Sequence, residues 1–335
     1  MRRRIALGFG LAIVLLLLLI TVVGSADVLE ELLAADRSLL GLGIASGVLS
    51  LTFRGLVWRQ FLLVVDETMT RGHVGSVFLT AMFLKYVTPY GQIATEPVVA
   101  YIVSSDAEMA YEDGFAGILS ADVLNYVPYY TFGLAALAFV VAIGALGEGM
   151  GTQLLAFAGF FVVLVTLVYV VLRRPSVVYR IVLSVAGLAR WVLVRVSDAV
   201  DERLEPAAVR ERLDNFYFSI ESITTDRRSL VLAVVYAHVA MVFLMLPVYL
   251  GALALGQEVA LPIVAIVVAL GKLGAVVPSP GGTGGVEAMV TVGLSTLGSI
   301  DPAAAFTIAL IYRASTYWLT IGIGGVAGFF LLVRQ

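Results

Sequence analysis

The stretch VVPSPGGTGGVEAMV, from Val276 to Val290, interrupts a long apolar run near the carboxyl end of the chain. Two prolines and four glycines within it disfavour a continuous helix, and a single glutamate follows them. Inside a membrane, non-helical backbone is tolerated only where it is buried in protein or lines a watery cavity. The stretch therefore predicts a broken helix that contributes to a polar site at membrane depth.

The composition of the whole chain predicts a membrane protein. Among its 335 residues, 60% are hydrophobic, and the mean hydropathy is +1.00. Several apolar runs approach the roughly 20 residues that a bilayer-spanning helix needs, and they are continuous rather than alternating, which excludes a transmembrane barrel. The chain has no cysteine and two histidines, so thiolate chemistry and a histidine metal site are excluded. We expect no cofactor, no metal and no nucleic-acid partner.

We predict an all-α polytopic membrane protein of one domain, 1–335. It would have six transmembrane helices and two re-entrant broken-helix hairpins in two inverted repeats, with cytoplasmic surface helices between them. The predicted parts are a first helix in 1–27, repeat one in 39–147 with hairpin 74–103, a linking helix at 152–172, a connector at 173–228, and repeat two in 229–333 with hairpin 261–297. A cleaved signal peptide is the rival interpretation of the first helix, and an ordinary solvated segment is the rival for the connector.

The distribution of arginine predicts the orientation of the chain. Three arginines follow Met1, and the connector is rich in arginine, so the positive-inside rule places both termini and the connector in the cytoplasm. The loops on the other side are mostly acidic. We therefore expect a multi-pass protein of the cell (plasma) membrane, with Arg54 and Arg59 near the inner face.

The two interrupted segments repeat one pattern. PYGQIATE, Pro89 to Glu96, and PGGTGGVE, Pro280 to Glu287, both read proline, any residue, glycine, four residues, glutamate. The only two lysines, Lys85 and Lys272, precede them, and an ionisable residue follows each glutamate by 26 positions, Asp122 and Arg313 respectively. Inverted repeats with broken helices at matching positions are typical of membrane transporters. We expect the two hairpins to meet near the middle of the membrane.

These residues form the candidate substrate site. A charge at the bilayer centre costs at least ~2.5–3.5 kcal/mol, so we expect lysine–glutamate pairing and an ion pair of Arg313 with Asp122 or Glu287. Backbone N–H groups at each break would attract an anion. The predicted substrate-binding residues are Lys85, Pro89, Gly91, Glu96, Asp122, Lys272, Pro280, Gly281, Gly282, Gly284, Gly285, Glu287 and Arg313, with no catalytic residue among them.

Alternative roles for the polar and aromatic residues remain open at this point. The ion pairs could serve only to bind helices together. We interpret His238 as a hydrogen-bonding residue in a helix interface, and we assign Trp58, Tyr317 and Trp318 to interfacial belts.

Three segments resemble a known family: VTPYGQIATEPVVAYIV, VVPSPGGTGGVEAMVTVGLSTLG and ALIYRASTYWLT. They are similar to the membrane region of lysylphosphatidylglycerol synthase, a flippase-like module, here expected to stand alone without the synthase domain. The resemblance implies two re-entrant hairpins in inverted halves, and movement of a lipid with a charged head group between leaflets. The first half departs from the family pattern, with TPYGQ in place of a Gly-Gly turn and Asp122 or a neighbour in place of an arginine.

We expect a lipid flippase or scramblase that moves a phospholipid or a polyprenyl-phosphate-linked lipid, and no enzyme activity. A small-anion or proton-coupled solute transporter is the alternative. A membrane enzyme with Glu96 and Glu287 as acid and base is a third interpretation. A membrane lipid is the expected partner, and the sequence leaves open a homodimer and a separately encoded lipid-modifying enzyme or glycosyltransferase.

Overall fold

The computed structural model describes residues 25–65, 69–106, 109–142, 150–193 and 205–333, and within them the regular elements are helices. The predicted first helix lies mostly outside the described residues. The elements are α2 (Ser25–Ala34), α3 (Arg37–Val65), α4 (Arg71–Val87), α5 (Gly91–Ala94), α6 (Glu96–Asp106), α7 (Tyr111–Ala142), α8 (Met150–Arg173), α9 (Pro175–Leu193), α11 (Pro206–Thr225), α12 (Arg227–Ala254), α13 (Leu261–Gly274), α14 (Gly285–Leu297), α15 (Pro302–Arg313), the π-helix η1 (Ala314–Trp318) and α16 (Leu319–Val333).

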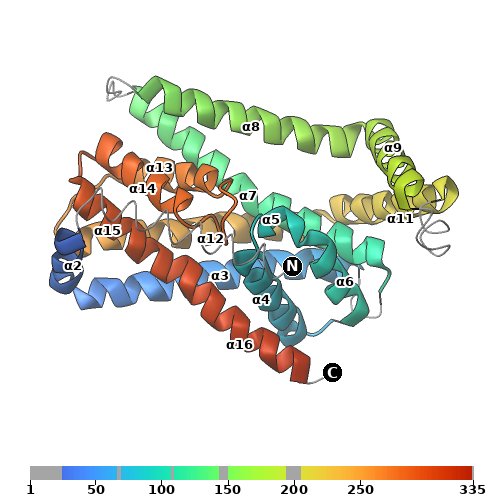
Figure 1. Ribbon diagram of the computed structural model, residues 1–335, viewed down its shortest axis with the longest axis horizontal. Coiled ribbons are helices and arrows are strands. Elements are labelled where there is room, and N and C mark those ends of the chain that lie inside the picture. Colours follow the sequence, from blue (N-terminus) through green and yellow to red (C-terminus); the bar gives the residue numbers. More distant parts are fainter. Residues whose placement is uncertain (1–24, 66–68, 107–108, 143–149, 194–204, 334–335) are drawn as a thin grey trace.

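Four of the described helical stretches are long and apolar enough to cross a bilayer: α3, α7, α12 and the continuous run α15–η1–α16. With the shorter apolar helices, they confirm a polytopic all-α membrane protein. The most extensive helix–helix interface among the described residues joins α3 and α12, which lie side by side along the long axis in Figure 1. The hydroxyls of Ser46 and Ser50 on α3 donate to the carbonyls of Phe243 and Ala240 on α12 at 2.7 and 2.9 Å, which fixes an antiparallel register.

Two broken hairpins approach each other from opposite ends of these long helices. Hairpin one is α4, a turn at 88–90, and α5–α6; hairpin two is α13, a loop at 275–284, and α14. Figure 1 places them toward opposite ends of α3. Their tips meet in an isolated antiparallel bridge between Pro89 and Pro280. The expected meeting of two interrupted segments is therefore confirmed in the described part of the chain.

The packing of the hairpins follows the inverted repeat. Hairpin one packs through α6 on α7 of its own repeat and through α4 on α16 of the other. Hairpin two packs through α14 on α15 of its own repeat and through α13 on α7 of the other. Each hairpin is thus held between two long helices, one from each repeat, as two inverted copies of one unit require.

Helix α12 begins with a capped first turn at the end of the molecule where α11 lies. The Asp226 carboxylate accepts from the backbone N–H groups of Arg228 and Ser229 at 3.1 and 3.3 Å. Hydrogen bonding from Ser229 holds the pKa of Asp226 below its usual range, because it stabilises the ionised carboxylate. The cap fixes where the connector ends and the long helix begins.

The connector contains two paired helices, α9 and α11. Tyr179 stacks on Tyr217 with 5.6 Å between ring centroids, and its hydroxyl donates to Asp214. The other side of α9 exposes an apolar stripe at helical spacing, which favours a membrane-surface helix over a solvated segment: Val177, Ile181, Val185 and Leu188.

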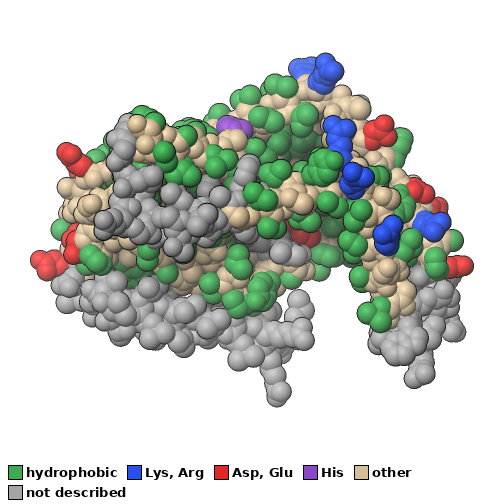
Figure 2. Space-filling model, turned by 90° about the horizontal axis from the view of Figure 1, so that it is seen from above, with side chains coloured by type: hydrophobic (Ala, Val, Ile, Leu, Met, Phe, Trp, Pro, Cys, Tyr) green, Lys and Arg blue, Asp and Glu red, His purple; other side chains and the backbone are tan. Residues whose placement is uncertain are grey.

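Charged side chains separate along the molecule. On the face drawn in Figure 2, lysine and arginine gather over the right-hand part, toward the end where α9 and α11 lie, and the charged side chains at the left end are acidic. The left end holds the α2 region and the loops after α12 and α14. The two ends therefore differ in charge, as the arginine pattern predicts.

The last helical run contains a π segment, and the predicted belts need correction. The π-helix η1 follows directly after Arg313 within the continuous run α15–η1–α16. Such single-turn π segments occur frequently at functional sites. Trp58 and Tyr317 are buried, 0% and 2% exposed, so they are not interfacial, whereas Trp318 is 52% exposed. Both buried rings carry a polar group that finds a partner inside the protein, as described below.

We expect Gly274→Ala to destabilise hairpin two. A Cβ at this position would lie 2.2 Å from the carbonyl oxygen of Gly285, and a backbone atom there cannot move aside. Overpacking of this kind costs about 1–3 kcal/mol, so the midpoint of thermal unfolding of the purified protein in detergent should fall. Gly75→Ala in α4 is the control, because a Cβ there meets nothing within 4 Å. Equal midpoints for the two variants would contradict this account of the hairpin.

Candidate functional site

Hairpin two is clamped to its long helix by an ion pair. Arg313 Nε donates to Glu287 Oε1 at 2.8 Å, and the two side chains are 7% and 2% exposed. Arg313 Nη2 also donates to the carbonyl of Gly281 at 3.1 Å and to the hydroxyl of Thr283 at 3.0 Å. One guanidinium therefore holds both the carboxylate and the loop, which matches the expected pairing of Arg313 with Glu287.

The start of α14 is occupied by the protein's own carboxylate. Glu287 Oε2 accepts from the backbone N–H of Gly284 at 2.7 Å, in the first turn where the helix dipole favours an acid. The backbone N–H groups of Gly282, Thr283 and Gly285 donate to carbonyls within the loop. The expectation that this helix start offers its N–H groups to a substrate anion is therefore wrong for the conformation described here, because Glu287 fills that role.

Hairpin one is held by a three-residue charge cluster. Lys85 Nζ at the end of α4 donates to Glu96 Oε1 on α6 at 2.8 Å and also to Asp122 Oδ2 on α7. Trp58 Nε1 on α3 donates to Asp122 Oδ1 at 2.9 Å, which explains why this indole is buried. The lysine lies 5.2 Å from the centroid of the Trp58 ring. The expected lysine–glutamate pairing is confirmed for Lys85.

The turn of hairpin one repeats one backbone feature of hairpin two despite its different sequence. Tyr90 has a φ of 53°, and Gly281, which follows the matching proline, has a φ of 58°. A left-handed conformation is strained for tyrosine and not for glycine. Gly91 is required because a Cβ there would lie 2.0 Å from the carbonyl oxygen of Lys85. The two turns therefore share a left-handed residue after the proline, and they differ at the next position, where Gly282 has a φ of 67° and Gly91 begins α5.

A narrow polar pocket lies between the hairpins, with a volume of about 50 Å³. Residues from α3, both hairpins, α7, α12 and the run α15–η1–α16 line it. Its polar lining residues are Ser50, Arg54, Tyr86, Tyr129, Lys272, Tyr312, Arg313, Thr316, Tyr317 and Thr320. A volume of this size accommodates on the order of a few water molecules.

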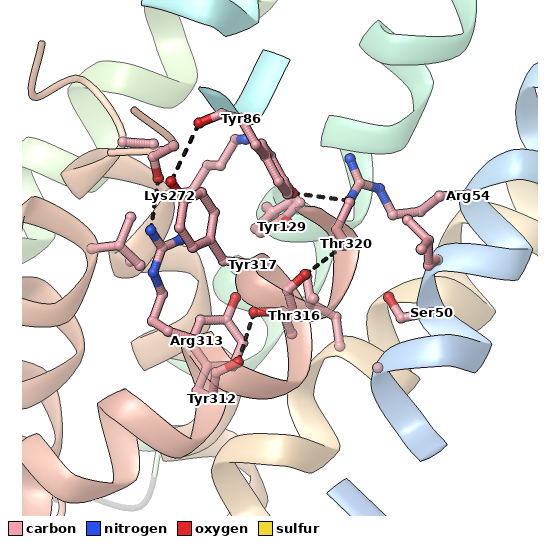
Figure 3. A pocket seen from close by; sticks show the side chains of 17 residues that line it. Ser50, Arg54, Tyr86, Tyr129, Lys272, Tyr312, Arg313, Thr316, Tyr317 and Thr320 are labelled. Atoms are coloured by element: carbon pink, nitrogen blue, oxygen red, sulfur yellow. Dashed lines mark hydrogen bonds between the residues drawn. The ribbon is translucent and has the colours of Figure 1, made fainter. Parts of the chain in front are cut away.

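The described residues that line this pocket include three cationic side chains, Arg54, Lys272 and Arg313. They include no aspartate or glutamate. In Figure 3, Arg54 and Arg313 lie on opposite sides, with Lys272 and tyrosine rings between them. Arg54 donates to the Tyr86 hydroxyl at 3.4 Å, and Lys272 lies 4.2 Å from the centroid of the Tyr126 ring. Arginine, lysine and phenolic hydroxyls together suit an oxyanion such as a phosphate or carboxylate group.

Tyr317 joins the pocket to the hairpin tips. Its ring lies 3.9 Å from the guanidinium carbon of Arg313, and its hydroxyl donates to the carbonyls of Tyr86 and Pro280 at 3.3 and 3.2 Å. One side chain from η1 therefore touches both hairpins and the arginine, so movement of either hairpin is transmitted to the pocket.

The predicted site residues divide into three groups in the structure. Lys272, Gly281 and Arg313 line the cationic pocket, and Lys85, Asp122 and Lys272 line a smaller neighbouring pocket of about 20 Å³. The remaining residues build the turns and ion pairs without lining either pocket: Pro89, Gly91, Glu96, Pro280, Gly282, Gly284, Gly285 and Glu287. The Lys272 ammonium lies over the rings of Tyr126 and Tyr129.

Sequence reasoning missed Arg54 and the hydroxyl-bearing residues of the pocket. Arg54 was explained by the positive-inside rule and given no place in the site, whereas it lines both pockets together with Lys272. The spacing of polar residues in the sequence could have predicted this lining. Residues four apart share a face of a helix, and two polar stripes run along otherwise apolar helices: Ser46, Ser50 and Arg54, and Tyr312, Thr316 and Thr320. His238 Nδ1 donates to the carbonyl of Val234 at 2.8 Å, and its Nε2 lies 3.0 Å from the Thr131 hydroxyl, which fits the predicted packing role.

We expect Arg313→Met to destabilise the protein strongly, because it leaves the Glu287 charge buried without its cation. Breaking a buried ion pair typically costs 3–5 kcal/mol. The double variant Glu287→Gln/Arg313→Met removes both charges and should recover part of the lost thermal stability in detergent. If the double variant melts no higher than Arg313→Met, the pair does not hold the hairpin as described.

Comparisons with known proteins agree with this architecture. The family model for the lysylphosphatidylglycerol synthase TM region matches residues 5–324. Two proteins of Methanothermobacter thermautotrophicus, each described as a UPF0104 membrane protein, are 22% and 25% identical to this chain. Each alignment covers 98% of this chain, with 95% and 93% of the respective relative. The chain belongs to the lysylphosphatidylglycerol synthase TM region family.

Proposed function

We propose that this protein moves a lipid with an anionic head group between the leaflets of the cell membrane. The observation that carries the proposal is the pocket between the hairpins, whose described lining includes Arg54, Lys272 and Arg313 and no aspartate or glutamate. Arg313 is buried and Arg54 and Lys272 are partly buried, so an uncharged or cationic cargo would gain little from a pocket lined by these three cations. A phosphate group would take charge-assisted hydrogen bonds from them.

The arrangement of the hairpins supports a transport role. Two inverted hairpins touch at Pro89 and Pro280, with the pocket beside the junction. Separating one hairpin from its long helices would open the pocket toward one side, and separating the other would open it toward the opposite side. A lipid head group would cross through the pocket while its acyl chains stay in the bilayer.

The small pocket volume supports a closed state. A phospholipid head group is larger than the few waters that about 50 Å³ admits, so the present conformation of the pocket is a closed one. Binding would therefore require the hairpins to move apart. We propose both termini and the connector in the cytoplasm, because the basic side chains gather toward the α9–α11 end.

We expect Lys272→Met and Arg54→Gln each to slow transbilayer movement of a fluorescent phosphatidylglycerol in proteoliposomes by roughly ten- to a hundredfold. The factor follows from losing one charge-assisted hydrogen bond of about 1.5–3 kcal/mol to the head group. We choose Lys272 and Arg54 for this test because substitution of Glu287 or Arg313 would also destabilise hairpin two. Access of dithionite to the labelled lipid reports the rate.

Arg180→Gln is the matched control, because Arg180 is exposed on α9, away from the pocket. It should move lipid at the wild-type rate. Wild-type rates in both pocket variants would contradict the assigned site. Uptake of inorganic phosphate by the wild type, without lipid movement, would instead favour the small-anion transporter, which the narrow pocket also suits.

A further inference from the structure

The two hairpin glutamates occupy matching positions in the repeat, yet their surroundings differ. Glu287 has both oxygens in hydrogen bonds, from Arg313 and from the Gly284 N–H, and one cation balances its charge. Glu96 has one oxygen on Lys85, and its other oxygen, Oε2, is buried without a hydrogen-bond partner among the described residues. Only one of the two carboxyl groups is therefore satisfied as a carboxylate.

Lys85 is shared between two acids. Its Nζ contacts both Glu96 Oε1 and Asp122 Oδ2, so these oxygens lie no more than two hydrogen-bond lengths, ~6 Å, from each other. Two carboxylates this close, away from water, do not both ionise readily, because their repulsion and desolvation oppose the second charge. One ammonium cannot neutralise both.

The surroundings indicate which of the two acids is ionised. Asp122 accepts from Lys85 and Trp58, and it lines the smaller pocket together with Arg54 and Lys272. Glu96 lines neither pocket and receives one hydrogen bond. The cations and hydrogen-bond donors from α3, α4 and α13 therefore stabilise the negative charge of an ionised Asp122. Of the two acids, Glu96 is then the one that holds a proton.

We propose that Glu96 is a proton-binding site whose occupancy is linked to the position of hairpin one. In the conformation described here, Glu96 is a neutral acid with its proton on Oε2. Release breaks the Oε2–H bond and transfers the proton to water, leaving a carboxylate. Two carboxylates then compete for one ammonium, and their repulsion drives α6 away from α7. The Glu96 side chain is 13% exposed against 2% for Glu287, so it lies nearer the surface of the protein, although its Oε2 is buried until hairpin one moves.

The link to transport rests on the proposed function. Movement of α6 away from α7 is an opening of hairpin one, so deprotonation favours a pocket open toward that side. Protonation restores the closed state. Repeat two has no such switch, since its ion pair is complete. The inverted repeats would thus differ in role, with hairpin one responsive to protons and hairpin two, held by Arg313, insensitive to them.

Infrared difference spectroscopy of the purified protein across a pH titration tests the proton site directly. The wild type should show the C=O stretching band of a protonated carboxylic acid that is lost as pH rises. Glu96→Gln should abolish the band, whereas Glu287→Gln should retain it. Asp122→Asn removes the competing charge and should shift the loss to lower pH. Identical titrations of wild type and Glu96→Gln would overturn the proposal.

Stability gives a second readout that does not depend on transport. Glutamine mimics a neutral glutamic acid, so Glu96→Gln should melt at or above the wild-type temperature in detergent at neutral pH. Glu287→Gln should melt lower, because it leaves Arg313 without its carboxylate. Failure of Glu96→Gln to fold would also count against a neutral Glu96.

Lipid movement tests the linkage. With fluorescent phosphatidylglycerol in proteoliposomes, the wild-type rate should change with pH by up to tenfold per unit, as one titrating group allows. Glu96→Gln should move lipid at a rate that no longer depends on pH. A retained pH dependence would break the linkage. If the wild type moves no lipid at all, the proposed function fails, while the infrared titration still decides whether Glu96 holds the proton.

Discussion

A helix that ends inside a bilayer must have its backbone groups and nearby charges satisfied by the protein itself, and the Glu287–Arg313 pair achieves this for hairpin two. The carboxylate caps the start of α14, and the guanidinium fixes both the carboxylate and two loop oxygens. Neither partner is tolerable there alone, since an unpaired buried charge costs several kcal/mol. The loop glycines then let backbone segments approach each other closely, as Gly274 and Gly285 do. The pocket exists because this break is stable.

The repeats use the same geometry with different electrostatics. In repeat two, the long helix supplies a cation to the hairpin glutamate. In repeat one, the long helix supplies Asp122, and the cation comes instead from Lys85 within the hairpin. The departure of the first half from the family pattern is therefore compensated locally. With Asp122 in place of an arginine, hairpin one is still held by an ion pair. The difference is that two carboxyl groups, those of Glu96 and Asp122, share one ammonium.

Much of this architecture could be predicted from the sequence. The breaks were evident because proline and glycine clusters within apolar runs have few structural explanations, and the 26-residue spacing from glutamate to Asp122 or Arg313 correctly brought those residues together. The pocket lining could not be predicted the same way. Arg54 lies near the end of an apolar helix, where the positive-inside rule explains it without a site, and the π-helix after Arg313 leaves no mark in composition. Trp58 and Tyr317 were misassigned to interfacial belts because the sequence alone does not show that their polar groups have partners inside the protein. The structure shows these partners to be Asp122 for Trp58 and the carbonyl of Pro280 for Tyr317.

The contact between the hairpin tips limits how the pocket can open. Tyr317 hydrogen-bonds to carbonyls of both hairpins while its ring stacks on Arg313, so neither hairpin can leave without disturbing the residue that fixes the other. If the pocket opens as proposed, we therefore expect its two sides to open in a coupled way rather than as two independent gates. Hairpin two is further restrained by its complete ion pair, whereas hairpin one depends on a lysine that two acids share. Under the proposed proton linkage, we expect motion to begin at the weaker of the two attachments, which is at α6, with the charge state of Glu96 as the controlling variable.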